Sequence, residues 1–221
     1  VAEMLELIDA LDIEELSSIE DENGQSVLFD KKFARTLVSI LSIFGKEKRN
    51  KLLTICSRNS QVDLLLLALN AIQRTGKYLQ NVEFTSIKAC DHLPAESQII
   101  LANVHDSTKH QIVITGPWAI TGVDCPSIDA VHWNFTPGSE ISITQGTGRG
   151  ARLSNGKKDV LVSFNIDLNN PISVIQSKVS STVLKIHESM FPSHDVELRQ
   201  RVRRRLGRRF LRVQRDTSGD V

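Results

Sequence analysis

The chain has 221 residues, 40% of them hydrophobic and 24% charged, a composition typical of a globular protein with one substantial core. No apolar run approaches the ~20 residues of a membrane-spanning helix, and no secretion signal begins the sequence, so we expect an intracellular protein, cytoplasmic or nuclear, with no membrane partner. Three widely spaced cysteines exclude a disulfide framework and a zinc cluster, and they indicate free thiols.

The net charge of +1 hides a strong segregation of charge along the chain. Residues 1–30 carry ten carboxylates and no Lys or Arg, whereas residues 192–221 carry nine Arg and four carboxylates. The basic middle and end of the chain suit a polyanionic partner, although a solvated surface is the simpler interpretation. Because Val1 is not Met, we expect a processed product or a piece of a longer protein.

In chain order, helical patterns come first and then alternate with short apolar runs. Apolar residues at helical spacing occupy positions 4–11, and a polar turn at Asn23-Gly24 separates them from a helix expected over 31–44. The elements expected next are a strand at 52–56, a helix from Ser60, a strand at 82–87, a helix from Pro94 to His105, strands at 111–115, 130–134 and 160–164, a short helix within 139–147, a long helix over 171–190 and an Arg-rich amphipathic segment over 197–215. This alternation predicts an α/β fold with a parallel sheet flanked by helices, an N-terminal helical lead-in and a C-terminal helical extension.

Two segments place glycines and polar side chains where predicted strands or their crossovers end: residues 115–129 (TGPWAITGVDCPSID) and 145–152 (QGTGRGAR). Ligands bind outside the carboxyl ends of the strands in such sheets. The Gly122-Val123-Asp124 turn can bring the backbone close to a ligand and aim one carboxylate at it. Arg149 and Arg152 are three residues apart, so a helix or turn would point both guanidinium groups in similar directions, which suits phosphate oxygens.

These segments resemble motifs V and VI of superfamily 2 helicases. Within that superfamily, their sequence pattern is most similar to restriction-enzyme motor subunits and related DNA translocases. Residues 51–57, a strand leading to a helix, occupy the place of motif IV. The resemblance covers roughly residues 30–167 and implies the second RecA-like domain of a helicase or translocase. It divides the chain into an acidic helical lead-in from a missing first domain (1–48), the RecA-like domain (49–168), and a helical extension with an Arg-rich tail (169–221).

The resemblance also implies roles for individual residues at a cleft between two RecA-like domains. The implied roles are arginine fingers on the γ-phosphate of ATP for Arg149 and Arg152, orientation of the site for Gln145, nucleotide binding for Gly122, Asp124 and Gly148, and contact with a nucleic-acid strand for Thr115, Thr121, Ser57 and Arg58. By analogy we expect DNA rather than RNA. The phosphates and Mg²⁺ would be held by a preceding RecA-like domain of the same polypeptide.

The sequence contains no GxxxxGK[ST] phosphate loop and no DExH-like carboxylate pair at a strand end, so the chain alone is not expected to hydrolyse ATP. Two alternatives stay open. A degenerate, non-catalytic RecA-like module that binds nucleic acid or a protein partner is favoured by Thr121, where helicases often carry Glu or Arg, and by Ser163. A different nucleotide-binding enzyme would need a glycine-rich loop after the first strand, and residues 57–60 (SRNS) do not provide one.

Overall fold

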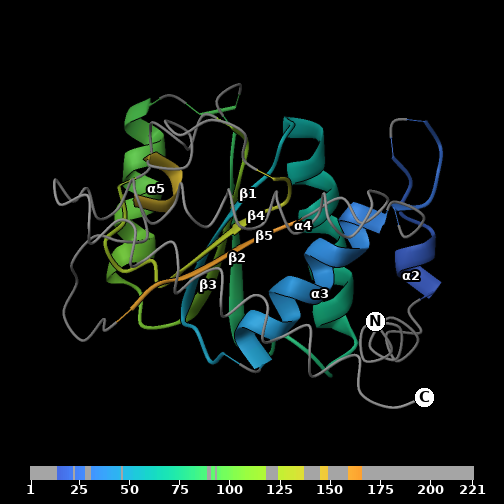
Figure 1. Cartoon of the computed structure of the whole chain (residues 1–221), viewed down its shortest axis with the longest axis horizontal. Helices are drawn as coiled ribbons and strands as arrows, with labels where there is room; N and C mark the ends of the chain where they lie inside the picture. The colour runs from blue at the N-terminus through green and yellow to red at the C-terminus, as the bar shows by residue number, and fades with distance from the viewer. Residues whose placement is uncertain are drawn as a thin grey trace, which may run out of the picture. The chain divides into compact units, whose positions relative to one another are not determined.

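The centre of the fold is a parallel β-sheet, seen here in a computed structural model (Figure 1). The structure describes residues 14–21, 23–27, 31–45, 47–88, 91–92, 94–117, 124–136, 145–148 and 159–165. The helical patterns expected at 4–11 and 171–190 and the Arg-rich segment over 197–215 lie outside these residues. Residues 139–144 of the short helix expected within 139–147 also lie outside them, and residues 145–148 are helical.

Five strands form this sheet in the order β2-β3-β1-β4-β5, and every neighbouring pair is parallel. The strands are β1 (Lys51–Ile55), β2 (Val82–Ile87), β3 (His110–Thr115), β4 (Ala130–Trp133) and β5 (Leu161–Phe164). The helices are α2 (Glu14–Ser17), α3 (Lys31–Gly45), α4 (Asn59–Arg74) and α5 (Pro94–Asp106). The parallel sheet confirms the predicted α/β fold, and the helices and strands predicted within the described residues differ from the observed ones by a few residues at their ends.

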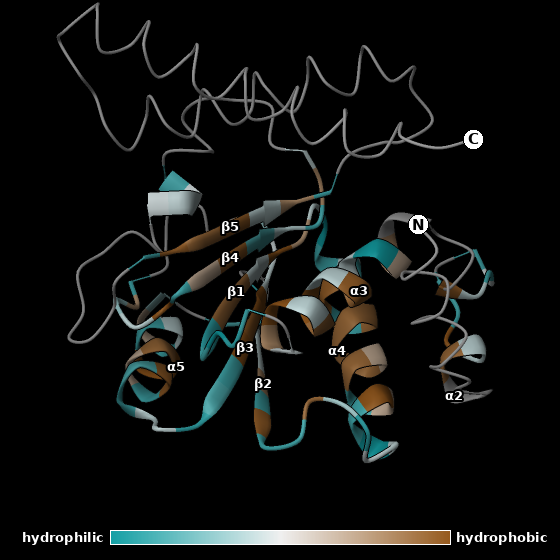
Figure 2. Cartoon of the chain, turned by 60° about the horizontal axis from the view of Figure 1, so that its bottom comes forward, coloured by the Kyte–Doolittle hydropathy of each residue, from teal (hydrophilic) through white to brown (hydrophobic). Residues whose placement is uncertain are grey.

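Helices cover both faces of the sheet: α3 and α4 lie on one face, and α5 lies on the other (Figure 2). The side chains of β1 alternate between these two layers because successive residues of a strand point to opposite faces. Leu52 and Cys56 pack with α3 and α4, whereas Leu53 and Ile55 pack with the residues of α5. The strands are therefore buried on both faces, which explains their nearly continuous apolar runs.

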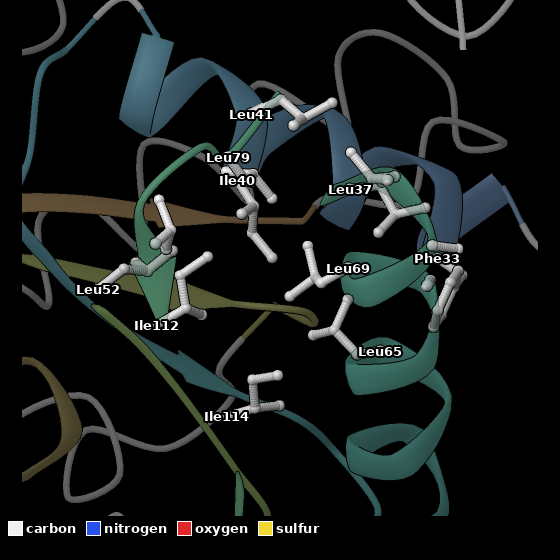
Figure 3. Close-up of a cluster of buried hydrophobic side chains, with 14 of the residues drawn as sticks. Phe33, Leu37, Ile40, Leu41, Leu52, Leu65, Leu69, Leu79, Ile112 and Ile114 are labelled. Atoms are coloured by element: carbon white, nitrogen blue, oxygen red, sulfur yellow. The ribbon is translucent and has the colours of Figure 1, made fainter. Parts of the chain in front are cut away.

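The packing of α3 on α4 builds the larger of the two apolar layers (Figure 3). The side chains that meet there are Phe33, Leu37, Ile40 and Leu41 of α3, Leu65 and Leu69 of α4, and Leu52, Ile112 and Ile114 of the sheet. Each of these buried side chains stabilises the fold by about 1.5–3 kcal/mol relative to an exposed position. The apolar face predicted for residues 31–44 is confirmed, and α3 is part of the core.

Two charged side chains fix the amino-terminal edge of the sheet. The Lys51 ammonium donates to the backbone carbonyls of Val104, His105 and Ser107 at 2.6, 2.8 and 2.8 Å, and it thereby caps the carboxyl end of α5. The Asp129 carboxylate accepts the backbone N–H groups of Asn50 at 2.9 Å and Lys51 at 2.9 Å. This edge is thus occupied by structural contacts.

The strand β4 contains a buried histidine, His132, although the strands of this sheet are otherwise mostly apolar. His132 is fully buried, and its Nδ1 lies 2.7 Å from the hydroxyl of Ser163, its partner in β5. Within the described part of the chain, its Nε2 has no hydrogen-bond partner. Burial lowers the pKa of His132 from 6.5 to about 3, because the charged imidazolium would lose its hydration.

Because His132 is buried and neutral, we expect the folding stability of the chain to fall in acid. In the unfolded chain His132 binds a proton below pH 6.5, whereas the folded protein keeps it neutral down to about pH 3, so stability falls as the pH drops through that window. Between pH 7 and 5 the loss is about 2 kcal/mol of unfolding free energy. Urea unfolding at both pH values should show this loss in the native chain and in His105→Gln, an exposed control, but not in His132→Leu. An equal pH dependence in His132→Leu would contradict the assignment.

Candidate functional site

The carboxyl ends of the central strands meet at the edge of the sheet opposite to Lys51 and Asp129. The Cys56 N–H donates to the Thr115 carbonyl at 2.7 Å, and the Asn134 N–H donates to the Ile55 carbonyl at 3.0 Å, so the ends of β3, β1 and β4 are joined side by side. Because parallel strands all end at one edge, this is where a ligand of such a fold binds. The site residues predicted at Ser57, Arg58 and Thr115 all fall here.

Residues 145–148 form a short helical turn that packs on the last residues of the two central strands. A Cβ atom added to Gly146 would lie 2.4 Å from the Trp133 ring and 3.2 Å from Cδ1 of Ile55, so the backbone touches both side chains. Thr147 is buried, Gln145 is exposed, and Gly148 is half-buried. Residues 145–148 therefore lie at the carboxyl edge of the sheet, and Gln145 is exposed there.

A side-chain amide that the sequence analysis missed organises the turn after β1. The Asn134 side chain accepts the Ser57 N–H at 3.0 Å and donates to Oε1 of Gln61 at 3.0 Å. The Ser57 hydroxyl donates to the same Gln61 oxygen at 2.8 Å. These bonds hold the turn between β1 and α4 in one conformation. Asn134 was predicted only as the last residue of a strand, although polar residues directly after parallel strands are the signal that marks such positions.

The same network extends to α3. The Asn165 side chain, directly after β5, donates to the Thr36 hydroxyl of α3 at 2.7 Å and to the Asn134 carbonyl at 3.3 Å. Asn134, Asn165 and Thr36 are all buried. Satisfied polar groups in a low-dielectric interior fix one geometry, because breaking any bond leaves a buried group unpaired. Helix α3 is thereby tied to the turn that carries Ser57.

The remaining predicted residues differ in how accessible they are. Ser57 and Arg58 are exposed, and Arg58 has an extended backbone (φ −142°, ψ 153°) as the residue that precedes α4. The Thr115 side chain is fully buried, and its hydroxyl donates to the Gly116 carbonyl at 3.2 Å, so in this structure it does not reach solvent. Asp124 is exposed, directly before the buried Cys125.

Four of the predicted site residues, Thr121, Gly122, Arg149 and Arg152, lie outside the described residues. Gly116, which follows Thr115, lies against α4: a Cβ atom there would meet Oδ1 of Asn59 at 2.1 Å. The backbone of this loop thus comes close to the first residue of the helix. Gly116 has no side chain, and this absence leaves room for the backbone to approach the helix.

The cysteines within the described residues do not suit nucleophilic chemistry. Cys56 and Cys125 are free and buried, and burial raises the pKa of the Cys56 thiol to about 12 and also raises the pKa of Cys125. In the described ranges, no group of three His, Cys, Asp or Glu side chains is placed to hold a metal ion. No helix described here is both long enough and apolar enough to cross a membrane.

Comparisons with known proteins support the fold. No protein-family model and no curated protein matches the sequence. The C-terminal part of the Fun30 ATPase domain matches with a TM-score of 0.51 at 12% identity, over 74% of this chain and 56% of that one. The chain therefore shares the fold of that domain, a parallel RecA-like sheet flanked by helices. It spans about half the length of that Fun30 structure.

Two further solved structures also match, with lower scores. The C-terminal domain of the DEAD-box protein Dbp5 has a TM-score of 0.49 at 16% identity, over 73% of this chain and 81% of that one. The Hef helicase domain of Pyrococcus furiosus has a TM-score of 0.46 at 14% identity, over 68% of this chain and 28% of that one. The fold assignment rests on the Fun30 structure. The likeness to restriction-enzyme motor subunits stays a prediction from the sequence.

Proposed function

We propose that this chain is the second motor domain of an ATP-dependent superfamily 2 helicase or translocase, and that it supplies arginine fingers and part of a track for nucleic acid. The main support is the packing of residues 145–148 against Ile55 and Trp133, at the carboxyl edge of the sheet. This helical turn leads into Arg149 and Arg152 of the sequence motif. The exposed Ser57 and Arg58 follow β1 at the same edge.

In this proposal ATP binds between this domain and a preceding RecA-like domain that holds the phosphates and Mg²⁺. The described residues fit that division, because the turn after β1 (57–60, SRNS) has no glycine and cannot form a phosphate loop. The exposure of Gln145 and the partial exposure of Gly148 support this proposal, in which both residues contact an approaching phosphate. Closure of the two domains then brings Arg149 and Arg152 to the γ-phosphate, where their charge stabilises the transition state. Gly122 and Asp124 contact the nucleotide.

The nucleic-acid strand, DNA in this proposal, follows the turns after β1 and β3. Arg58 is exposed at the first of these turns, and a guanidinium suits phosphate oxygens. The neighbouring Ser57 is exposed as well, and its hydroxyl donates to Gln61. Because the Thr115 side chain is buried, the contact from the end of β3 falls to the exposed Pro117 and to Thr121 further along the loop. Asn134 holds the Ser57 turn in place through the bonds described above.

If the turns after β1 and β3 bind nucleic acid, the chain itself should bind single-stranded DNA, and this binding should depend on salt. Fluorescence anisotropy with labelled dT20 should give a dissociation constant that rises with NaCl concentration, because bound phosphates release counterions. Arg58→Ala should weaken binding several-fold and reduce the slope of log K against log[salt] by about 1. The control is Lys77→Ala, which removes a positive charge before β2, at the opposite end of the strands. No binding at low salt, or equal losses in both variants, would refute the track.

A further inference from the structure

The turn between β1 and α4 has a fixed hydrogen-bond polarity, which the roles proposed so far do not use. Ser57 has two donors, its backbone N–H and its hydroxyl. Because the backbone N–H can only donate, the atom of Asn134 that lies 3.0 Å from it has to be the amide oxygen. The amide nitrogen of Asn134 is then the atom that faces Gln61, at 3.0 Å. One backbone group thus decides how the Asn134 amide is oriented.

The orientation of Gln61 and of the Ser57 hydroxyl follows from that of Asn134. Because Asn134 presents an N–H₂ group, the Gln61 atom that meets it has to be the oxygen, Oε1. The same oxygen lies 2.8 Å from the Ser57 hydroxyl and can only accept, so the hydroxyl donates its proton to Gln61. The three residues form a hydrogen-bonded ring in which neither amide can be reversed without placing two donors together.

Ser57 therefore has no donor left for a ligand. Its N–H and its hydroxyl proton are both used within this hydrogen-bonded ring, whereas its hydroxyl oxygen keeps two lone pairs, and the residue is exposed. Phosphate oxygens accept hydrogen bonds, so a phosphate at Ser57 would meet lone pairs or would have to break the bond to Gln61. A group that donates a hydrogen bond fits this position without any rearrangement.

The backbone of a nucleic-acid strand carries a donor only where its sugar is ribose. The phosphates and deoxyribose of DNA have none, whereas the ribose 2′-hydroxyl donates and accepts, and it is the group by which a protein distinguishes RNA from DNA at a given site. Base amines also donate, but they differ from base to base, and thymine and uracil lack one. A contact at Ser57 that is independent of base sequence therefore requires a 2′-hydroxyl.

We propose that the Ser57 hydroxyl oxygen accepts a hydrogen bond from a ribose 2′-hydroxyl, so that the turn after β1 distinguishes RNA from DNA. The inference rests on the proposed function, because the strand has to pass this turn. A DNA strand still binds through its phosphates, and an RNA strand gains one further bond. Asn134 and Gln61 are positioning residues here, because together they decide the direction of the Ser57 proton.

Fluorescence anisotropy with three labelled strands tests this preference. The chain should bind rU20 about fivefold more tightly than dU20, which is the effect of one hydrogen bond between neutral groups. A 2′-fluoro-U20 strand keeps the sugar pucker of RNA but cannot donate from the 2′ position, so it should bind like dU20. Equal affinities for rU20 and dU20, or for rU20 and the 2′-fluoro strand, would overturn the proposal.

Two variants that each add one negative charge separate the polarity of the hydrogen-bonded ring from its charge. In Gln61→Glu the carboxylate still accepts from Asn134 and Ser57, so the preference for rU20 should stay. In Asn134→Asp the carboxylate still accepts the Ser57 N–H but has no proton for Gln61, whose amide then turns its N–H₂ group inwards. Ser57 then accepts from Gln61 and its proton becomes free, so the preference should be lost. The same outcome in both variants would contradict the assigned polarity.

Ser57→Ala separates this inference from the proposed track. It should lower the affinity for rU20 about fivefold, to that of dU20. The control is Thr108→Val, which removes the hydroxyl of an exposed residue before β3 and should keep the preference. An equal loss for both strands in Ser57→Ala would mean that the hydroxyl donates to phosphate, which overturns the proposal and supports the track. Salt-dependent binding of rU20 and dU20 with equal affinity would overturn the ribose contact alone. No binding of any strand at low salt would refute both.

Discussion

Replacing Arg149 with alanine is expected to lower the ATP turnover of the full-length polypeptide by about 10³-fold or more, which is the effect of losing an arginine finger. The finger acts on charge that develops in the transition state, so kcat should fall while KM for ATP changes little. Steady-state kinetics at saturating nucleic acid measure both constants. Arg149→Lys should recover little of the loss, because an ammonium lacks the planar fork of donors.

The control for this experiment is Lys77→Ala, an equal loss of charge far along the chain from the motif. It should leave kcat within about twofold of the unchanged enzyme. If the turnover of Arg149→Ala stays within a few-fold of the unchanged enzyme, the finger assignment is wrong. The chain would then be better explained as a non-catalytic RecA-like module that binds nucleic acid or a protein partner. Measuring dT20 binding by Arg149→Ala shows whether such a module still binds nucleic acid.

Much of the fold could be predicted because its signals are local. The strand at Leu52–Cys56 is an apolar run bounded by polar residues, and the apolar spacing from Phe33 to Phe44 predicts a buried helical face. Both are confirmed, with strand ends shifted by one residue. The Asn23-Gly24 turn is also confirmed by the positive φ of Gly24. In each case the residues that decide the structure are neighbours in the sequence.

Contacts between distant residues could not be predicted from such signals. Asn165 and Thr36 are 129 residues apart, and nothing in either segment shows that one amide will join the end of β5 to α3. The cap of α5 by Lys51 is similar, because a Lys at a strand start is normally an exposed residue. His132 was predicted simply as part of a buried strand; its neutral state follows only from the full burial that the folded sheet imposes.

The candidate site could be predicted only in part, because only some of its features depend on local sequence. The sequence placed Ser57 and Arg58 after a strand, and the structure brings them to the edge where residues 145–148 pack. It could not reveal that Thr115 turns its side chain into the interior, since both faces of this sheet are covered. It also could not reveal Asn134, whose amide spans from Ser57 to Gln61. A motif thus predicts the composition of a site better than it predicts which atoms face the ligand.

Gly146→Ala is expected to destabilise the domain by about 3 kcal/mol, because overpacking of a filled core has costs of this order. The new Cβ atom would lie 2.4 and 2.6 Å from two carbons of the Trp133 ring. Trp133 is fully buried and packs edge-on against Phe135 with ring centroids 5.4 Å apart, so it has little room to yield. Thermal unfolding should show a melting temperature lower by about 6–12 °C.

Gly148→Ala provides the stability control from the same helical turn, because its added Cβ atom meets nothing within 4 Å. Its melting temperature should stay unchanged or rise slightly, since alanine has a higher helix propensity than glycine. A similar decrease in both variants would mean that the turn needs glycine for its backbone and not for its contact with Trp133. If Gly146→Ala were as stable as the unchanged chain, residues 145–148 would not be packed on the strand ends. The main structural support for the arginine-finger assignment would then be lost, because the position of the motif VI segment at the sheet edge depends on that contact.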